Sequence, residues 1–354
     1  MEKIRIQLAH RFASLGHDVE FVLQNKRGEW LDCLPSGVPV IGLGARQLRS
    51  TVRPLVSYLR ARRPGALLAA MWPLTSIAVW ARDLGRVPMR VVISDHTDYS
   101  ASKMSATSAG RFKLQTTMRL TYPRADGVVA VSHGVARSVA RFSGLRAERI
   151  NVVHNPVRLP SAEERQCPCE AAQDWADHAG PRLIAMGSFK EPKNFPLLLR
   201  AFETVRKQVD ARLLILGEGD LRGELEGLVR DLGIQDDVSM PGFVARPWPY
   251  LARADLFVLS SSWEGFGNVI IEALACGTPV VSTDCPSGPR EILGDDRYGR
   301  LVPVGDARSL AAAIVSGCSE SHNREALRRR AAEFSVENAA DCYLRLLVTD
   351  SSLE

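Results

Sequence analysis

Two glutamates, Glu264 and Glu272, flank a glycine-containing turn and are the residues of this chain best placed to do chemistry. The segment 260–285 reads SSSWEGFGNVIIEALACGTPVVSTDC, with Gly265 and Gly267 on either side of a phenylalanine. At such a turn, unpaired N–H groups and the positive end of a helix dipole both favour an anion, and phosphate is the obvious candidate. We therefore expect a phosphate-bearing ligand whose hydroxyl groups donate hydrogen bonds to the two carboxylates.

Each glutamate also has a plain structural interpretation. Glu264 would be a solvated loop carboxylate, and Glu272 would lie on an exposed edge of a helix. A glutamate within an otherwise apolar helical segment costs free energy unless a partner offsets its desolvation, and a pair of ribose hydroxyls would do so. The structural interpretation stays open for either residue alone, whereas their combination with the glycine turn favours binding.

The elements that must hold this turn follow from the apolar pattern. Residues 254–259 form an apolar run of strand length, and residues 269–274 place apolar side chains at helical spacing. Gly277 can end that helix, a proline follows, and residues 280–282 are the next buried strand. The segment is therefore predicted to be strand, loop, helix and strand, with the glycine-rich loop at the helix N-terminus.

The run EGFGNVIIE at 264–272 resembles the paired-glutamate signature of the family-4 retaining glycosyltransferases, also called glycosyl transferases group 1. Further segments agree in order and spacing: Gly187 with Lys193-Asn194, Leu216–Asp220, Gly242-Phe243, Ser282–Glu291 and Leu301–Asp306. Together they cover the C-terminal half almost continuously, which makes the resemblance specific. It implies the GT-B architecture, in which two Rossmann-like, doubly wound α/β domains face each other across a cleft.

The resemblance also implies a role for each site residue. Lys193 matches the phosphate-binding lysine, whose charge would offset the charge that develops on the departing nucleoside diphosphate. The backbone N–H groups of Asn268 and Val269 would meet the distal phosphate, Glu272 the ribose and Glu264 the transferred sugar. The expected donor site comprises Gly187, Ser188, Lys193, Gly265, Phe266, Gly267, Asn268, Val269 and Glu272, and the expected catalytic residues are His96, Glu264 and Lys193.

Three of these positions have a second interpretation or depart from the family. Without Gly187 and Asn194 beside it, Lys193 would be taken as a solvated lysine before a helix. The family usually has an arginine directly after the glycine, but this chain has Ser188, so one half of the phosphate clamp is missing or supplied elsewhere. His96 follows a first-domain strand, where the family often places a histidine near the reacting centre, although a lone histidine there is more often structural.

The rest of the chain alternates between strand-length and helix-length apolar segments, which predicts parallel sheets with helices on both faces. We expect a basic, acceptor-binding domain over 1–157, a nucleotide-sugar-binding domain over 158–334, and a C-terminal helix in 335–354 that crosses back to the first domain. The expected strands of the first domain are 18–23, 38–43, 66–70, 90–94, 127–131 and 150–153, and its helices are 2–15, 51–63, 74–84, 109–122 and 134–142.

The beginning of the chain departs most from the family. Family members open with a strand and a glycine-rich loop, whereas residues 1–10 here already match the first helix and residues 17–23 the second strand. The first strand of the N-terminal domain is apparently missing. We therefore predict that the given chain is a fragment with an upstream start, or else a weakened transferase in which nucleotide binding survives better than turnover.

Composition points to a soluble globular protein, with 45% hydrophobic and 24% charged residues in 354. No apolar run approaches the roughly 20 residues that span a bilayer, and the N-terminus is unlike a signal peptide, so we expect a cytoplasmic protein. The seven cysteines are predicted to be free thiols. No Asp-x-Asp pair ends a strand, so no metal and no cofactor beyond the donor substrate are expected.

Charge is distributed unevenly along the chain. Residues 1–157 hold 23 Lys and Arg against 10 Asp and Glu, a net charge of +13, while the remainder holds 22 against 30, a net charge of −8, which sum to the overall +5. Six arginines cluster on and before one predicted helix: Arg46, Arg49, Arg53, Arg60, Arg62 and Arg63. They would attract an anionic membrane surface at roughly 1 kcal/mol each, or else they are ordinary solvated side chains on a helix surface. No recognition motif accompanies them, so nucleic acid is not an expected partner.

Three functions remain. The first is a retaining glycosyltransferase of hexosyltransferase type, which moves a sugar from a nucleotide-sugar donor to a saccharide or lipid-linked saccharide acceptor in cell-surface glycan synthesis. The second is hydrolysis by paired carboxylates, which the phosphate-type loop disfavours. The third is a non-catalytic nucleotide-sugar-binding or partner subunit, to which Ser188 and the unusual N-terminus lend weight.

Overall fold

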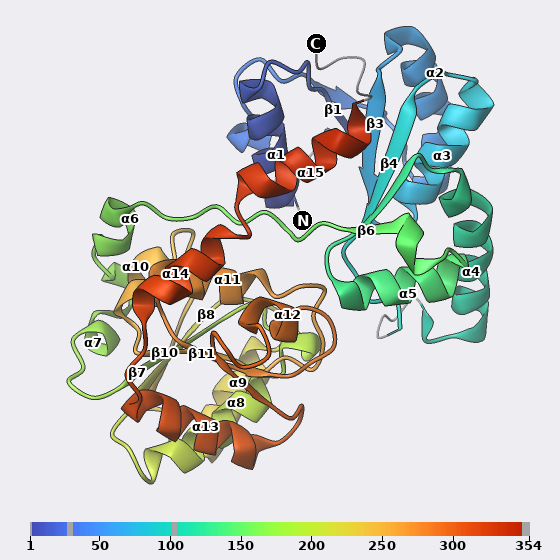
Figure 1. Ribbon diagram of the computed structural model, residues 1–354. Coiled ribbons are helices and arrows are strands. Elements are labelled where there is room, and N and C mark those ends of the chain that lie inside the picture. The colour runs from blue at the N-terminus through green and yellow to red at the C-terminus, as the bar shows by residue number, and fades with distance from the viewer. Residues whose placement is uncertain (1, 27–30, 101–104, 349–354) are drawn as a thin grey trace. The chain divides into compact units, whose positions relative to one another are not determined.

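The computed structural model describes residues 2–26, 31–100 and 105–348. They form two compact units, of which unit 1 comprises Met1–Pro156 with Ser335–Glu354 and unit 2 comprises Val157–Phe334. Every strand pairing in both units is parallel, and helices pack against the sheets (Figure 1). The predicted pair of parallel α/β domains is confirmed.

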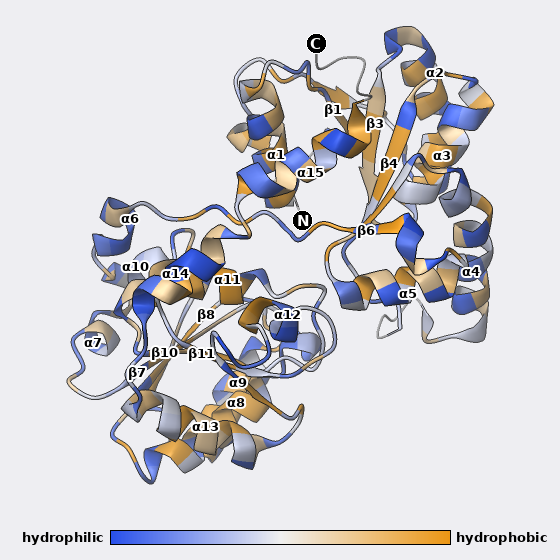
Figure 2. Cartoon of the chain, viewed as in Figure 1, coloured by the Kyte–Doolittle hydropathy of each residue, from blue (hydrophilic) through white to orange (hydrophobic). Residues whose placement is uncertain are grey.

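Unit 1 contains two separate parallel sheets, ordered β1-β2 and β3-β4-β5-β6. Its strands are β1 (Phe21–Leu23), β2 (Val40–Gly42), β3 (Ala66–Ala70), β4 (Arg90–Asp95), β5 (Gly127–Ala130) and β6 (Ile150–Val152). Its helices are α1 (Glu2–Ser14), α2 (Val52–Arg62), α3 (Leu74–Gly85), α4 (Ser108–Thr121), α5 (His133–Ser143) and α15 (Val336–Leu347). Figure 2 shows β3 and β4 mainly in hydrophobic colours, as expected for strands that helices cover.

The C-terminal helix α15 belongs to unit 1, where it packs on α1 and β4. One apolar cluster joins the buried face of α1 to the sheet and to Tyr343 of α15. Three residues of α1 at four-residue spacing, Ile4, Leu8 and Phe12, are buried and form the face that enters this cluster. Helix α1 thus forms because a C-terminal segment far away in sequence covers it.

The split of the unit 1 sheet leaves two strand edges without a ladder partner. No pairing joins β1 to β3 in the described part of the chain, and both strands line a pocket of about 1480 Å³ together with residues of α1 and α15. Strands β1 and β2 are also shorter than the predicted segments 18–23 and 38–43, because a lone pair of strands has little to stabilise it. The predicted absence of a strand before the first helix stays a prediction.

Unit 2 contains one six-stranded parallel sheet with the order β12-β11-β10-β7-β8-β9. Its strands are β7 (Arg182–Met186), β8 (Arg212–Leu216), β9 (Val238–Gly242), β10 (Leu256–Leu259), β11 (Val280–Thr283) and β12 (Arg300–Val302). Its helices are α6 (Ala162–Gln166), α7 (Gln173–Ala176), α8 (Phe195–Arg206), α9 (Arg222–Asp231), α10 (Trp248–Arg253), α11 (Asn268–Cys276), α12 (Pro289–Leu293), α13 (Ala307–Ser319) and α14 (Arg324–Ala332). The strand order reverses between β7 and β10, and ligands of such sheets bind at the carboxyl ends on either side of this point.

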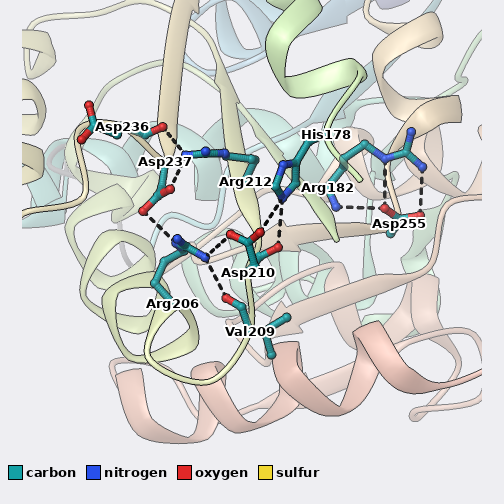
Figure 3. Close-up of polar contacts among 9 residues, drawn as sticks. All are labelled: His178, Arg182, Arg206, Val209, Asp210, Arg212, Asp236, Asp237 and Asp255. Carbon is teal, nitrogen blue, oxygen red and sulfur yellow. Dashed lines mark hydrogen bonds and ion pairs between the residues drawn. The ribbon is translucent and has the colours of Figure 1, made fainter. Parts of the chain in front are cut away.

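A cluster of ion pairs joins the opposite, amino-terminal ends of these strands (Figure 3). Arg182, at the start of β7, bonds Asp255 before β10 through its backbone N–H at 2.9 Å and its Nε at 3.1 Å. Asp237, before β9, pairs with Arg206 at 2.7 Å and also with Arg212 at the start of β8. These charges fix the strands at the edge away from the glycine loop, so we interpret them as structural.

Two further expectations concern the chain as a whole. The seven cysteines are free, as predicted. Among the helices that the structure describes, none has the length and apolar character required to cross a membrane.

Candidate functional site

The loops that follow β7 and β10 bring together the two charged residues of the predicted site. The Lys193 Nζ donates to Glu264 Oε1 at 2.6 Å. The side chains are only 19% and 11% exposed, respectively, so water screens the pair weakly. The site thus holds a lysine and a carboxylate whose opposite charges offset each other.

Three consecutive serines after β10 hold this pair in place. Ser261 Oγ donates to the same Glu264 oxygen at 2.7 Å, and Ser260 Oγ donates to the carbonyl of Lys193 at 2.9 Å. Ser262 N–H donates to the carbonyl of Pro192 at 2.8 Å, which links the two loops. The sequence reasoning did not assign these serines a role, although a polar run directly after a buried strand was a usable signal.

The spacing between Gly187 and Lys193 has a packing explanation. A Cβ on Gly187 would lie 3.2–3.4 Å from Cε, Cδ and Cγ of Lys193, so the aliphatic stem of the lysine lies directly on the glycine. Gly217, in the loop after β8, approaches even more closely, because its Cβ would lie 1.9 Å from the carbonyl oxygen of Gly187. The glycines therefore allow three chain segments to meet at the carboxyl edge of the sheet.

The glycine turn before α11 has the conformation that the sequence predicted. Gly267 is the N-cap of α11 with φ of +94°, which favours glycine, and its carbonyl accepts a hydrogen bond from the N–H of Ile270 at 2.9 Å. The Phe266 ring, however, is 2% exposed and packs edge-on against Phe334 at a centroid distance of 5.7 Å. Phe266 can thus meet a ligand only through its main chain.

A second loop presses against this turn. A Cβ on Gly288 would lie 1.7 Å from the Phe266 carbonyl oxygen, and the N–H of Glu264 donates to the carbonyl of Pro286 at 3.4 Å. Cys285 of this loop is buried, and burial together with the Glu264 charge raises the pKa of its thiol to about 12. The loop thus places a buried, protonated thiol beside the carboxylate.

The remaining donor-site residues lie as follows. Asn268 and Val269 open α11 and are half-buried, and Gly265 lies in the turn before them. Glu272 is half-buried on α11 between two buried residues, so its carboxylate is partly desolvated. Ser188 is exposed and carries no charge, so position 188 adds no cation to Lys193.

His96 belongs to unit 1 and directly follows β4. The ring is 9% exposed, and its Nε2 lies 2.8 Å from Ser94 Oγ. Burial, and then the charge of Arg5, lower the pKa of His96 to about 3, so the imidazole is neutral at physiological pH. A neutral imidazole can donate one hydrogen bond and accept another, but it brings no charge to a substrate.

A buried polar network that the sequence did not reveal lies beside this histidine. Asp95 is fully buried at the end of β4 and accepts a hydrogen bond from the Tyr99 hydroxyl. Burial raises the pKa of Asp95 to about 6. The Tyr122 hydroxyl lies 3.0 Å from Thr75 Oγ1 and extends the network to α3. These contacts fix the start of the loop that carries His96.

Metal ligands were not expected, and the described residues contain no group of three or more His, Cys, Asp or Glu side chains that could hold a metal ion. The positive charge at the site in unit 2 comes from Lys193 and from the N-terminus of α11.

The site and fold can now be compared with known proteins. Residues 3–156 match the family described as glycosyl transferase 4-like domain, and residues 180–319 match glycosyl transferases group 1. The chain is 31% identical over 255 residues to the N-acetylgalactosamine-N,N'-diacetylbacillosaminyl-diphospho-undecaprenol 4-alpha-N-acetylgalactosaminyltransferase of Campylobacter jejuni, covering 72% of this chain and 67% of that relative. It is 34% identical over 259 residues to the lipopolysaccharide core biosynthesis glycosyltransferase LpsE of Rhizobium meliloti, covering 70% of this chain and 73% of that relative.

Solved structures agree in fold. The Anabaena protein HepE, in complex with UDP and glucose, superposes with a TM-score of 0.80 at 19% identity and covers 99% of this chain and 96% of that one. The lipopolysaccharide outer core galactosyltransferase WaaB superposes with a TM-score of 0.75 at 18% identity, covering 98% and 94%. Fold and site thus define a glycosyltransferase of the GT-B type. Within that class, the chain belongs to the glycosyl transferases of group 1, and it is a transferase enzyme.

Proposed function

We propose that this protein is a retaining glycosyltransferase, of hexosyltransferase type, that moves a sugar from a nucleotide-sugar donor to a saccharide or lipid-linked saccharide acceptor in cell-surface glycan synthesis. The observation that carries the proposal is the ion pair of Lys193 with Glu264 beside the N-terminus of α11. A cation and a helix N-terminus suit a diphosphate, and a carboxylate next to them suits the hydroxyls of a sugar.

In this proposal Lys193 exchanges partners when the donor binds. The diphosphate attracts the ammonium group, which offsets the charge that develops on the leaving nucleoside diphosphate. Glu264 then accepts hydrogen bonds from the transferred sugar, while Ser261 Oγ, at 2.7 Å, keeps the carboxylate oriented. Glu272 would accept from the ribose hydroxyls, and the N–H groups of Asn268 and Val269 would meet the distal phosphate.

The donor and acceptor classes are supported by relatives. Structures of HepE contain UDP, UDP-glucose, or UDP and glucose. The name of the Campylobacter relative specifies a diphospho-undecaprenol acceptor, and that of a Mycobacterium tuberculosis relative, 28% identical over 353 residues, specifies GDP-mannose and a phosphatidylinositol dimannoside. These relatives support a nucleotide-sugar donor and a lipid-linked acceptor.

Calorimetry with UDP, GDP and their sugar conjugates tests donor binding, and Glu272→Ala is the variant to compare. We expect Glu272→Ala to lose most nucleotide-sugar affinity while its thermal unfolding stays that of the wild type. Unchanged donor affinity in this variant would remove the assigned role of Glu272. The anomeric configuration of the product, read by NMR, then distinguishes retention from inversion.

Metal independence is also a proposal. Lys193 and the helix N-terminus supply positive charge where other transferases use a cation, so transfer should continue in the presence of EDTA. Activity that chelation abolishes and magnesium or manganese restores would contradict this.

We further propose a cytoplasmic protein that associates peripherally with the cytoplasmic face of the membrane, where a lipid-linked acceptor resides. The excess of basic residues in 1–157 supports this, since anionic lipids attract such a surface.

A second candidate is a non-catalytic nucleotide-sugar-binding or partner subunit. The exposed, uncharged Ser188 favours it, because one cation fewer at the phosphate position weakens stabilisation of the leaving group. Tight UDP-sugar binding without transfer to any lipid-linked or saccharide acceptor would establish this alternative. Release of free sugar at a rate that acceptors do not change would instead point to hydrolysis.

A further inference from the structure

Helix α4 (Ser108–Thr121) presents two large apolar side chains to solvent. Leu114, Met118 and Thr121 form its buried face, whereas Phe112 is 71% exposed and Leu120 is 58% exposed. Phe112 and Leu120 are eight residues apart, so they point about 80° from each other around the helix axis, both away from the buried face, and lie roughly 12 Å apart along it. Two such exposed apolar side chains on the outer half of one helix are candidates for insertion into a partner.

The exposed part of α4 is also strongly basic, with cations on either side of the apolar pair. Arg111, Lys113 and Arg119 are exposed, and none of them forms an ion pair within the part of the chain that the structure describes. Arg111 lies over the Phe142 ring at 5.8 Å and Lys113 over the Trp72 ring at 5.9 Å, contacts that leave both charges in place. The apolar pair is therefore flanked by cations.

The neighbouring helix α5 (His133–Ser143) continues the basic surface. It lies beside α4 (Figure 1) and exposes Arg137 and Arg141. Neither α4 nor α5 contains an aspartate or glutamate. We name the exposed side of these two helices the α4 surface, defined by Phe112, Leu120, Arg111, Lys113, Arg119, Arg137 and Arg141.

The arginines before and on α2, which the sequence singled out, make a poorer membrane surface. Arg62 pairs with Glu20, and Arg60 donates to the carbonyls of Gly85 and Leu84 at 3.2 and 3.3 Å. Among the described residues of α2 no large apolar side chain is exposed. Near these arginines Leu48 is 40% and Leu84 is 63% exposed, but no exposed aromatic side chain accompanies them in the described part of the chain. Stable interfacial binding needs both an apolar insertion and electrostatic attraction, and the α4 surface combines an exposed phenylalanine with cations that form no ion pair among the described residues.

Charge decides between the occupants that could cover this surface. A second copy of the chain in a symmetric contact would place these cations against one another, which is unfavourable. Nucleic acid would satisfy the arginines but leave Phe112 and Leu120 without a recognisable role, since no recognition motif accompanies them. An anionic bilayer accommodates both features, because phosphates meet the cations while the two side chains enter the headgroup and acyl boundary.

We propose that the α4 surface docks this protein on an anionic lipid bilayer, with Phe112 and Leu120 inserted and the five basic residues on lipid phosphates. The proposal rests on the peripheral membrane association proposed above and names the surface that serves it. It does not depend on the sugar-transfer chemistry.

The experiment is flotation of the full chain with vesicles of phosphatidylcholine, with or without an equal amount of phosphatidylglycerol. Wild type should float with the mixed vesicles and release as salt rises. The variant Phe112→Ser with Leu120→Ser should lower the partition coefficient at least about tenfold. The variant Arg111→Gln, Lys113→Gln and Arg119→Gln should lose the preference for anionic lipid and most of the salt dependence.

Matched controls separate a local effect from a general loss of surface apolarity or charge. Phe243→Ser removes a phenylalanine of unit 2 that is 62% exposed and should leave flotation unchanged. Phe112→Trp should retain binding, because tryptophan suits the membrane interface. Arg49→Gln with Arg53→Gln and Arg63→Gln removes charge around α2 and should reduce flotation far less than the α4 variants.

The outcomes distinguish the two levels of the proposal. If wild type floats and the Phe112 and Leu120 variant floats equally well, the α4 assignment is wrong while membrane association stands. If wild type floats with neither vesicle, both fail. A change of oligomeric state in this variant, without vesicle binding by wild type, would make the surface a contact between copies instead.

Discussion

Replacing Glu264 by Gln is expected to tighten UDP binding while it slows sugar transfer. Glu264 Oε1 accepts from Lys193 Nζ at 2.6 Å and from Ser261 Oγ at 2.7 Å. Glutamine keeps the shape and an acceptor oxygen for Ser261 but removes the negative charge. Lys193 is then available to the diphosphate without competition from Glu264, and the charge of Glu264 no longer repels the phosphates.

The magnitude follows from the burial of the pair. With side-chain exposures of 19% and 11%, its strength lies between surface pairs and fully buried ones, at about 1–2 kcal/mol. Releasing Lys193 should therefore lower the Kd for UDP by about 5- to 30-fold. Lys193→Met removes the cation itself, and the loss of a charge-assisted contact worth about 2–3 kcal/mol should raise that Kd about 30- to 150-fold.

The measurement is calorimetric titration of UDP into wild type, Glu264→Gln and Lys193→Met. Lys190→Met is the matched control, since Lys190 is an exposed lysine of the same loop and should leave the Kd unchanged. Thermal unfolding of each variant checks that the fold is kept. The reasoning is refuted if Glu264→Gln weakens UDP as Lys193→Met does, because the carboxylate would then support the nucleotide rather than compete for the lysine.

Other predictions address the support of the site and the two units. Ser261→Ala should lower kcat about tenfold, since one hydrogen bond that orients Glu264 is lost, with little change in the Kd for UDP; an equal effect on both would show a general disturbance. Asp255→Ala should destabilise unit 2 by about 2 kcal/mol in urea unfolding and leave UDP affinity unchanged. The pKa of His96 is lowered from 6.5 to about 3 by burial, so the unfolded chain binds more protons between these values and stability falls as pH drops below 6.5. His96→Gln should remove about 2 kcal/mol of the stability difference between pH 7 and pH 5, and an unchanged difference in urea unfolding would contradict this. Amides of the edge strand β3 should exchange with solvent faster than those of β4, which is paired on both sides, and equal protection would count against the open edge.

Local sequence pattern predicted most strands and helices because apolar runs in a parallel sheet are buried on both faces. The predicted strand 66–70 coincides with β3, and the predicted turn at 265–267 immediately precedes α11. Gly267 as N-cap and Gly277 as C-cap follow directly from the conformational freedom of glycine. In such segments, the local residue pattern is enough to predict the local structure.

What escaped prediction depends on contacts between distant segments. The separation of the β1-β2 sheet from the β3-β4-β5-β6 sheet depends on which strands pair. The residues of a single strand do not determine its pairing partner. The buried ring of Phe266 depends on Phe334, and the role of Ser261 depends on the position of Glu264 in the folded loop. An apolar ring next to a phosphate-type turn looks like a ligand contact until its packing partner is known.

The motif that identifies the family encodes packing as much as chemistry. Gly217 and Gly288 are required because a Cβ would collide with the backbone of a neighbouring loop, and Gly187 leaves room for the stem of Lys193. These positions specify how the loops after β7, β8, β10 and β11 pack at the carboxyl ends of the strands. Lys193 and Glu264 bring opposite charges into contact there. A chain can therefore keep the glycine pattern, and with it the shape of the site, while a change at one uncharged position such as Ser188 alters the rate of the chemistry. For this reason the measurements on Lys193 and Glu264, rather than the match of the motif, determine how these two residues contribute to donor binding and to sugar transfer.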